Sequence, residues 1–530
     1  MPEKYQVLMH CPFCRGDTIK MRFDRRFWRL GHQCTGEDCP WPERYLPFYI
    51  VDEEIYRFLP TVVLGTLDKA ASVAIQAAMR GLVGAPLGLC SEDMHGYTYA
   101  TRSKRPTGCL VPDCPGRREH LPMAAERFAP RLRLQDELHL LRDSLGAVDS
   151  HYESLLDHIQ TQLGSPRAKV VASSATLTGH DRQVDVLYQR QGRVFPLQGP
   201  TAAESFWTRQ SNAPLRRYVA VAPRGVTLEH VSDRTVNVLQ TAIRRLAHDP
   251  ITVCTEAGVD PGHADRLLDL YGTDVVYGNT LHEVEAAERS LATNTNMPVN
   301  AVQLTGSTDF DDVRDVLDRL ETPEPGFEDR IHVVAASSML SHGVDVARLN
   351  VMVMLGLPLG TAEFIQTSAR VGRSYPGLVY VLHKIGRERD AATFRQFHAY
   401  IPHGDRFVDP VPITRRSRRV LRKTLPGLIE ARRLMLMEPA AGNLATVKAL
   451  RAYAQASHLT AADQTQAVAR ALGFDDPDSA VLTEEIRQWL TTWFANLHDP
   501  ASPARWPSEL SVDSPMISLR DVESRVSVWE

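Results

Sequence analysis

An acidic pair is the first feature of this sequence whose residue types and spacing could do chemistry. Asp136 and Glu137 stand in the string Gln135–His139, which follows an apolar stretch, Phe128 to Leu134, that predicts a buried strand. At the carboxyl end of such a strand, one carboxylate can hold Mg²⁺ through water while the other orients and deprotonates an attacking water. Taken alone, an Asp-Glu-x-His string is also explained by chance or by the start of a helix.

Small hydroxyl side chains follow the next predicted strand, Lys169–Ala172. Ser173, Ser174 and Thr176 stand at its carboxyl end, where such residues can couple a nucleotide site to a neighbouring surface. A helix N-cap or a turn is the simpler explanation of these hydroxyl residues when they are taken alone.

Two arginines later in the chain could stabilise a transferring phosphoryl group. A helix is expected after the predicted strand Val351–Leu355, and if it continues, Gln366, Arg370 and Arg373 are spaced i, i+4, i+7 on one face. Arginine suits this role because its planar fork stays charged and bonds bidentately. A surface helix that happens to carry two arginines is the alternative.

The elements that must position these residues read as an α/β fold. Short apolar strands alternate with helical periodicity, which predicts parallel sheet covered on both faces. The expected strands are Thr61–Gly65, Arg131–Leu134, Lys169–Ser173, Arg217–Val221, Ile251–Cys254, Asp274–Tyr277, Asn300–Leu304, Ile331–Ala335, Val351–Leu355 and Leu378–Leu382. The expected helices include Lys69–Leu82, Asp143–Leu163, Val231–Ala247 and Leu281–Leu291.

The order of these motifs resembles that of a known class of motor protein. Asp-Glu-x-His, Ser-Ala-Thr, Gly-x-Asp and Gln-x-x-x-Arg-x-Gly-Arg stand in the order of motifs II, III, V and VI of superfamily-two helicases. Three longer strings resemble the DrmA-type helicases of the bacterial DISARM anti-phage defence system. They are DEEIYRFLPTVVLGTLDK, QDELHLLRDSLG and the segment from Ser341 to Gln366, and the resemblance runs from about Cys11 to Ser514–Val522.

The resemblance implies an α/β architecture with two RecA-like parallel-sheet domains, the first incomplete, a zinc-ribbon insertion and a helical C-terminal extension. Residues 1–50 would be the zinc-ribbon-like cysteine module and 51–206 the partial first RecA-like domain, with motifs Ib, II and III. Residues 207–400 would be the helicase C-terminal domain with motifs IV, V and VI. Residues 401–530 would be a basic linker and the helical extension.

The resemblance also implies roles for single residues. Asp136 and Glu137 would be the Mg²⁺ and water residues, and His139 would contact the γ-phosphate network. Gly343 and Asp345 would meet the ribose and the phosphates of ATP.

Further roles concern phosphoryl transfer and the grip on nucleic acid. Arg370 and Arg373 would be arginine fingers, with Gln366 beside them. Ser174 and Thr176 would link hydrolysis to the grip on nucleic acid, and Thr66 would lie where the first domain touches the nucleic-acid backbone.

Two departures from the family pattern matter. Ala369 stands where many relatives have Gly, a mild change. More seriously, the sequence contains no G-x-x-x-x-G-K-[ST] loop, so the β- and γ-phosphates lack their cradle.

In the family this loop lies upstream of the cysteine pairs, so the chain is expected to begin inside the first motor domain. A split or truncated gene, with a separate N-terminal chain that carries the loop, is the preferred explanation. A degenerate, non-hydrolysing homologue is the second.

Seven of the eight cysteines lie before residue 115, a clustering that favours metal over disulfides in a cytoplasmic chain. Cys11, Cys14, Cys34 and Cys39 have the spacing of a closed structural Zn²⁺ site. A second, less regular group offers Cys90, His95, Cys109, Cys114 and, further on, His120. Unrelated thiols are the alternative for the first group, and buried free thiols with a surface histidine for the second.

The charge and composition narrow the functional classes. The net charge is −4, the apolar fraction is 43%, and no apolar run approaches a membrane span, so no membrane partner and a cytoplasmic location are expected. A basic run could track DNA or RNA phosphates or form a solvated helix face. Its predicted nucleic-acid contacts are Arg415, Arg416, Arg418 and Arg419.

Three functional hypotheses follow. The first is an ATP- and Mg²⁺-dependent helicase or translocase that another chain supplies with a phosphate loop, working with other defence-system subunits; this chain alone is expected to be inactive. The second is a zinc-containing, catalytically dead platform that binds nucleic acid. The third is the remnant of a broken helicase gene.

Overall fold

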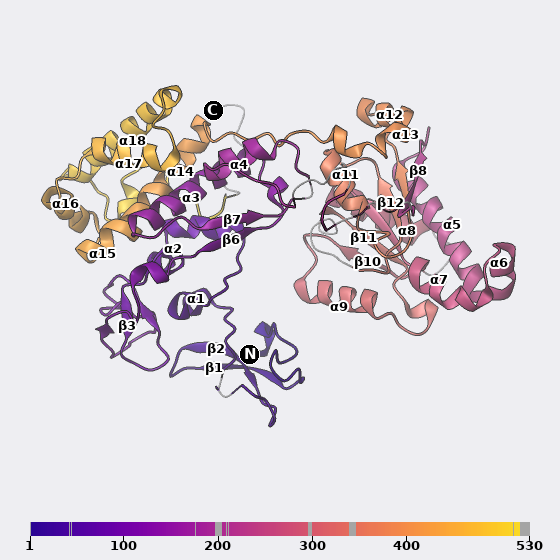
Figure 1. The fold of residues 1–530 in the computed structure, drawn as a ribbon, viewed down its shortest axis with the longest axis horizontal. Coiled ribbons are helices and arrows are strands. Elements are labelled where there is room, and N and C mark those ends of the chain that lie inside the picture. The colour runs from indigo at the N-terminus through magenta and orange to yellow at the C-terminus, as the bar shows by residue number, and fades with distance from the viewer. Residues whose placement is uncertain are drawn as a thin grey trace. The chain divides into compact units, whose positions relative to one another are not determined.

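The computed structural model describes residues 2–41, 43, 45–174, 176–196, 204–207, 209, 211, 213–294, 299–338, 346–511 and 513–519. The chain forms two compact units (Figure 1). Unit 1 comprises Met1–Ser174, Gly179–Arg193 and Val411–Glu530, and unit 2 comprises Ala175–Thr178 and Val194–Pro410. The C-terminal extension therefore folds together with the N-terminal part of the chain. Among the described residues, no helix is long and apolar enough to cross a membrane.

An antiparallel hairpin stands near the start of unit 1. β1 (Ile19–Asp24) pairs with β2 (Arg29–Cys34). On β1, Ile19 and Met21 are buried while Lys20 between them is exposed. This period-two burial is what an antiparallel pair with one covered face requires. The strand-like stretch expected from Thr18 to Leu30 is thus two strands and a turn.

A short helix leads from this hairpin to a second small sheet. In Figure 1, α1 (Asp52–Phe58) lies between the hairpin and the sheet of β3 (Gly88–Cys90). In that sheet β3 pairs antiparallel with both β4 (Tyr97–Thr98) and β5 (Arg118–Glu119).

The predictions for the segment between α1 and β3 are wrong. The strand expected at Thr61–Gly65 is an exposed loop. The helix expected at Lys69–Leu82 is broken into three short pieces. They are η2 (Leu67–Ala74), η3 (Ala77–Met79) and α2 (Arg80–Val83).

A parallel pair of strands carries the acidic motif. β6 (Leu132–Gln135) pairs with β7 (Lys169–Ala172), with Gln135 opposite Ala172. One face of this pair is open: Leu134 on β6 is 74% exposed and Val171 on β7 is 47% exposed. The expectation that β6 is a buried strand is therefore wrong for this face. The other face packs toward α3 (Asp143–Gln162), and α4 (His180–Tyr188) packs on α3.

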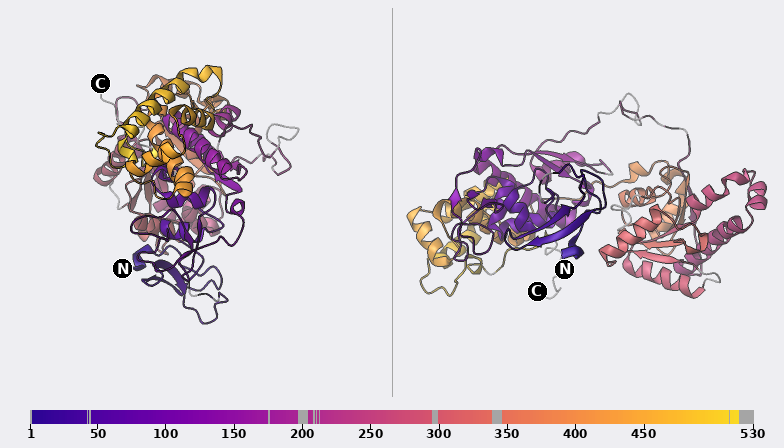
Figure 2. Two further views of the ribbon diagram at one scale, coloured as in Figure 1. Left: turned by 90° about the vertical axis from the view of Figure 1, so that its left-hand side faces the viewer. Right: turned by 90° about the horizontal axis from the view of Figure 1, so that it is seen from below.

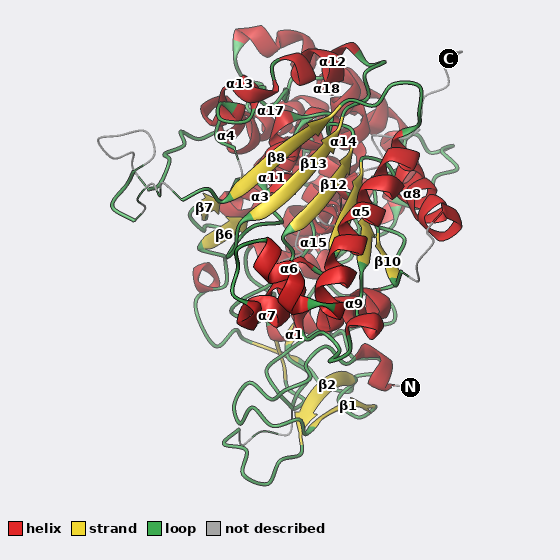
Figure 3. Ribbon diagram, turned by 90° about the vertical axis from the view of Figure 1, so that its right-hand side faces the viewer, coloured by secondary structure: helices red, strands yellow, loops and turns green. Residues whose placement is uncertain are grey.

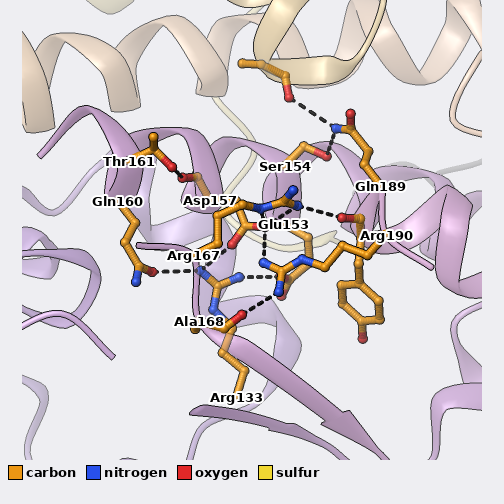
Figure 4. A network of polar contacts seen from close by, with 12 residues as sticks. Arg133, Glu153, Ser154, Asp157, Gln160, Thr161, Arg167, Ala168, Gln189 and Arg190 are labelled. Carbon is orange, nitrogen blue, oxygen red and sulfur yellow. Dashed lines mark hydrogen bonds and ion pairs between the residues drawn. The ribbon is translucent and has the colours of Figure 1, made fainter. Parts of the chain in front are cut away.

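A partly buried charge network ties these strands to the helices (Figure 4). Arg133 of β6 lies 2.6 Å from Glu153 and 3.2 Å from Asp157, both on α3. Arg167 and Arg190 each approach Asp157 to 2.6 Å. One aspartate on α3 thus receives guanidinium groups from β6, from the residues before β7 and from the end of α4.

The C-terminal helices complete the core of unit 1. Figures 1 and 2 show them beside α3, and Leu155 and Ile159 of α3 share one apolar cluster with Leu425 and Leu472 from those helices. The elements are α14 (Arg418–Arg432), the π-helical turn η9 (Arg433–Met437), α15 (Glu438–Ala441), α16 (Val447–Ala456), α17 (Ala461–Leu472) and α18 (Ala480–His498).

A six-stranded parallel sheet forms the centre of unit 2 (Figure 3). Its order is β10-β11-β9-β12-β13-β8. The strands are β8 (Arg216–Val221), β9 (Asp274–Gly278), β10 (Ala301–Leu304), β11 (Val333–Ala336), β12 (Val351–Leu355) and β13 (Gly377–Leu382). The three central strands, β11, β9 and β12, are buried throughout, as expected for parallel strands covered on both faces.

Helices cover both faces of this sheet. Val276 of β9 faces the side of α5 and α8, whereas its neighbours Val275 and Tyr277 face the side of α9 and α11. The helices are α5 (Leu228–His248), α6 (Pro250–Glu256), α7 (Ala264–Tyr271), α8 (Leu281–Asn294), α9 (Phe310–Glu321), α11 (Thr361–Ser368), α12 (Glu388–Arg395) and α13 (Phe397–Tyr400).

The predicted fold class, α/β with parallel sheet and a helical C-terminal region, is confirmed. One strand of the prediction is wrong, because Ile251–Cys254 lies within α6. Asp249 caps this helix by accepting a hydrogen bond from the Thr252 N–H at 3.1 Å, and Pro250 occupies its first turn. A cap and an N-terminal proline outweigh the strand preference of the β-branched residues that follow.

Candidate functional site

The acidic motif is held rigidly at the carboxyl end of β6. Glu137 has φ 51° and ψ 49°, which is a left-handed backbone conformation. For a residue with a side chain this conformation costs about 1 kcal/mol, and it is found more often at functional sites than elsewhere. The backbone N–H of Glu137 donates to Asp136 Oδ1 at 3.0 Å, and Leu138 N–H donates to the Ser173 carbonyl at 2.8 Å. The Glu137 carboxylate lies 3.3 Å from His139 Nδ1.

Asp136, Glu137 and His139, which the sequence predicts as one site, are therefore together. Asp136 is exposed and Glu137 is half-buried, so both carboxylates are open to a cation or a water. Gln183 fixes the chain just beyond them by donating to the carbonyls of Leu138 at 2.7 Å and Leu141 at 3.1 Å.

The hydroxyl that meets the acidic pair is that of Ser173. It donates to Asp136 Oδ1, and Glu137 N–H lies 3.4 Å from its oxygen. The sequence places Ser173 at the strand end but assigns the coupling role to Ser174 and Thr176, which are both half-buried. The sequence alone does not reveal the register of the two parallel strands, which is what brings Ser173 to the acidic pair. Gln135 is opposite Ala172, so the residues that follow them, Asp136 and Ser173, are also opposite each other.

In unit 2, Gln366, Arg370 and Arg373 do not lie on one face of a single helix. α11 ends at Ser368, so Arg370 and Arg373 lie in the turn that follows it, while Gln366 is buried on the helix. The expectation of i, i+4, i+7 spacing on a single helix is wrong. Arg370 is half-buried and Arg373 is exposed.

Two features shape this arginine-bearing turn. Gly372 has φ +67°, and a Cβ there would lie 2.7 Å from the Gly377 nitrogen, so a side chain would be both strained and crowded. Arg216 of β8 donates through Nε to the Val371 carbonyl at 2.6 Å and through Nη2 to the Ala369 carbonyl at 3.3 Å. Arg216 is a positioning residue, and no feature of the sequence marks it out.

Other predicted residues stand apart from these two groups. Gly343 and Asp345 lie outside the described residues. Thr66 is exposed in the loop before η2.

The basic run is mostly engaged with the protein itself. Arg415 is 8% exposed, it donates to Ser154 Oγ at 2.5 Å, and burial lowers its pKa to about 10. Arg416 lies 3.0 Å from Asp476, and Arg418 lies 2.8 Å from Glu485. Burial removes Arg415 from the exposed patch that the sequence predicts. Arg419 is exposed.

Both cysteine groups come together as the sequence predicts. The ligand atoms of Cys11, Cys14, Cys34 and Cys39 lie within 4.8 Å of one another. The Sγ atoms of the pairs Cys11–Cys39 and Cys14–Cys34 are each 3.7 Å apart, close to the edge of about 3.8 Å in a tetrahedron with metal–sulfur bonds of about 2.3 Å. Hydrogen bonds from Thr18 and from the Gly36 backbone lower the pKa of Cys34 to about 6, which favours the metal-binding thiolate.

The second group is Cys90, His95, Cys109 and Cys114, again within 4.8 Å. His95 Nδ1 lies 3.1 Å from the Cys114 sulfur, 3.7 Å from that of Cys109 and 3.8 Å from that of Cys90. Burial raises the pKa of Cys109 to about 12, a penalty on the thiolate that a bound dication would reverse. His120 is not in this group, so three thiols and one imidazole form the set.

Comparison with known proteins agrees with this geometry. The family model for the helicase conserved C-terminal domain matches residues 264–375, which run from the start of α7 to just beyond Arg373. The DISARM protein DrmA of Bacillus paralicheniformis (strain ATCC 9945a / NCIMB 11709 / CD-2) is 30% identical over 439 residues, covering 77% of this chain and 37% of DrmA. The chain is therefore similar to DrmA over most of its own length, and residues 264–375 match the helicase conserved C-terminal domain. This confirms the resemblance drawn from the motifs, and the chain spans little more than a third of the length of DrmA.

Solved helicase structures show a weaker likeness. The DUF1998 helicase MrfA bound to DNA and AMPPNP is 16% identical, with a TM-score of 0.40 over 58% of this chain and 37% of MrfA. The Mycobacterium smegmatis helicase Lhr bound to ssDNA and AMP-PNP is 16% identical, with a TM-score of 0.38 over 67% of this chain and 38% of Lhr.

Proposed function

We propose that this chain is part of a DrmA-like, ATP-dependent helicase or translocase that acts on nucleic acid in a phage-defence system. The observation that carries the proposal is the acidic pair Asp136 and Glu137, held in a strained turn at the carboxyl end of a parallel strand and hydrogen-bonded to Ser173. The similarity to DrmA and the match to the helicase C-terminal domain support it.

The residues have distinct proposed roles in ATP hydrolysis. Asp136 would hold Mg²⁺ through water, and Glu137 would orient and deprotonate the attacking water with His139 beside it. Arg370 and Arg373 of unit 2, with Gln366 nearby, would stabilise charge on the transferring phosphoryl group. Gly343 and Asp345 keep their proposed contacts to ribose and phosphates.

A further polypeptide segment would supply the phosphate loop, since the sequence has no G-x-x-x-x-G-K-[ST]. That segment could come from the same polypeptide or from a partner chain. The open face of β6 and β7 supports this part of the proposal, because Leu132, Leu134 and Val171 are 52%, 74% and 47% exposed there. Apolar side chains on parallel strands are normally covered by further strands and helices.

The nucleic acid would be DNA or RNA, gripped by Thr66, Ser174, Thr176 and exposed arginines such as Arg419. Each of the two Cys/His groups is proposed to hold one structural Zn²⁺. Each group supplies four protein ligands, four thiolates in the first and three thiolates with the His95 imidazole in the second. A tetrahedral metal so bound has no open position for catalysis, so the metals would serve the fold.

The test is nucleic-acid-stimulated ATP hydrolysis by this chain combined with the polypeptide that carries the phosphate loop. We expect Glu137→Gln and Arg373→Ala each to lower kcat by at least about a hundredfold. The matched controls, Glu126→Gln and Arg395→Ala, change exposed residues of the same units and should leave kcat within about twofold.

If both site variants keep full activity, the site assignment is wrong. A chain that binds DNA with a steep salt dependence, but never responds to nucleotide in the combined sample, would instead be the catalytically inactive platform.

A further inference from the structure

Arg57 occupies an unusual position between the two proposed metal sites. It lies on α1, its side chain is completely buried, and it is among the largest fully buried side chains of the described residues. Its guanidinium donates to four backbone carbonyls. Nη1 donates to Trp28 at 2.8 Å and Nη2 to Phe27 at 2.9 Å, while Nε donates to His95 at 2.8 Å and Nη2 also to Met94 at 2.7 Å.

These four carbonyls belong to two different modules. Phe27 and Trp28 form the turn of the β1–β2 hairpin, whose second strand ends at the metal-site residue Cys34. Met94 and His95 belong to the loop of the second site, and His95 is itself a ligand of that site. One side chain therefore joins the two metal-site modules through the backbone of each.

Other contacts hold the loop of the second site close to α1. Gly96 has φ +76°, and a Cβ there would lie 2.2 Å from the Arg57 carbonyl oxygen, so only glycine permits the loop to approach α1 this closely. Tyr99 Oη donates to the Tyr56 carbonyl at 2.5 Å.

Within the described residues, the buried apolar cluster around each set of thiols is small. The first consists of Cys11, Ile19 and Leu46, and the second of Cys90, Cys109 and Val111, beside Tyr99 and Leu110 of the main core of unit 1. A bound metal would add order to modules with clusters of this size.

The energetics then link the two sites. A buried guanidinium is costly unless its N–H groups are satisfied. All N–H groups used by Arg57 are satisfied only when both the hairpin turn and the His95 loop are in place. Each of these segments would be stabilised by the metal proposed for its own module.

We propose that the two Cys/His groups form one cooperative two-metal module in which Arg57 makes the binding of metal at each site depend on the other. This inference rests on the proposed metal sites and is independent of the proposed ATP hydrolysis.

The first experiment uses Co²⁺ as the probe in the full chain. A site with four sulfurs and a site with three sulfurs and one nitrogen give different visible ligand-field bands, so each site can be followed separately. Release to excess EDTA is measured in the wild-type chain and in Cys11→Ser, which disables the first site. We expect the second site of Cys11→Ser to lose Co²⁺ at least about tenfold faster.

The second experiment tests the link itself. Arg57→Lys keeps the charge, but its compact ammonium cannot span four carbonyls. We expect both sites to release Co²⁺ about tenfold faster, and the added effect of Cys11→Ser on the second site to disappear. Arg57→Met is a second variant that removes the donors altogether. Arg25→Lys is the matched control, because Arg25 is an exposed residue of the same turn, and its release rates should equal those of the wild type.

Unchanged release from the second site in both Cys11→Ser and Arg57→Lys would overturn the coupling. A wild-type chain that shows neither ligand-field spectrum would overturn the metal sites and this inference with them. The ATP hydrolysis assay would be unaffected by either result, so failure here is distinguishable from failure of the proposed enzymatic function.

Discussion

Asp157 of α3 holds together the elements that carry the acidic motif, β6 and β7, and the helices beside them. Its side chain is 8% exposed and is approached by the guanidinium groups of Arg133 at 3.2 Å and of Arg167 and Arg190 at 2.6 Å each. Asp157→Asn keeps the volume and removes the charge, leaving three guanidinium groups without their shared partner.

The expected loss of stability follows from the exposure of the partners. Removing one member of a fully buried ion pair costs about 3–5 kcal/mol. Arg167 and Arg190 remain 40% and 22% exposed, so water can solvate them and the cost should be lower, about 2–3 kcal/mol. For a unit of this size, that corresponds to a fall in Tm of about 3–5 °C.

Thermal unfolding at pH 7, followed by circular dichroism, measures this loss. Hydrogen exchange of the β6 and β7 amides would localise it. Glu484→Gln is the matched control, because Glu484 forms an exposed ion pair with Arg487 in the same unit, and such a pair contributes at most about 1 kcal/mol. If Asp157→Asn unfolds within 1 °C or so of Glu484→Gln, the network in Figure 4 does not hold the strands.

Two further predictions concern pH. Burial raises the pKa of Asp274 to about 7, so the folded state keeps a proton that the unfolded chain releases above about pH 4, and stability is lost as pH rises between these values. Asp274→Asn should therefore raise the Tm of unit 2 at pH 8 but not at pH 4, and equal shifts at both would contradict this. Burial lowers the pKa of His151 to about 4, so stability is lost as pH falls below about 6.5. His151→Gln should narrow the Tm difference between pH 7 and pH 4.5, and an unchanged difference would show that His151 is not responsible.

The central strands of unit 2 were predictable because their burial is nearly complete. Strands β9, β11 and β12 lie within one or two residues of the expected bounds, since a strand covered on both faces must be a short apolar run. The cysteine groups were predictable for a different reason: a metal site demands particular side chains, and their types and spacing are visible in the sequence.

The predictions that failed concern features set by contacts between residues far apart in the sequence or by the conformation of a single glycine. The arginine-bearing turn leaves the helix at Ser368 because Gly372, at φ +67°, packs against Gly377. Nothing in the spacing of the arginines reveals this. Arg57 and Arg216 were missed because they bond to backbone carbonyls, which every residue has, so no partner residue type marks the contact.

The strand pair β6 and β7 is stabilised by contacts with its surroundings. A sheet of two strands is marginal by itself, and this pair has an open apolar face. It is held from the opposite side, where Arg133 on β6 reaches Glu153 and Asp157, and Arg190 donates to the Ala168 carbonyl just before β7. Charged contacts on one side thus fix the register that places Ser173 level with the acidic pair, while the other side stays uncovered. The open apolar face is thus available for another polypeptide segment to cover, as the proposed function requires.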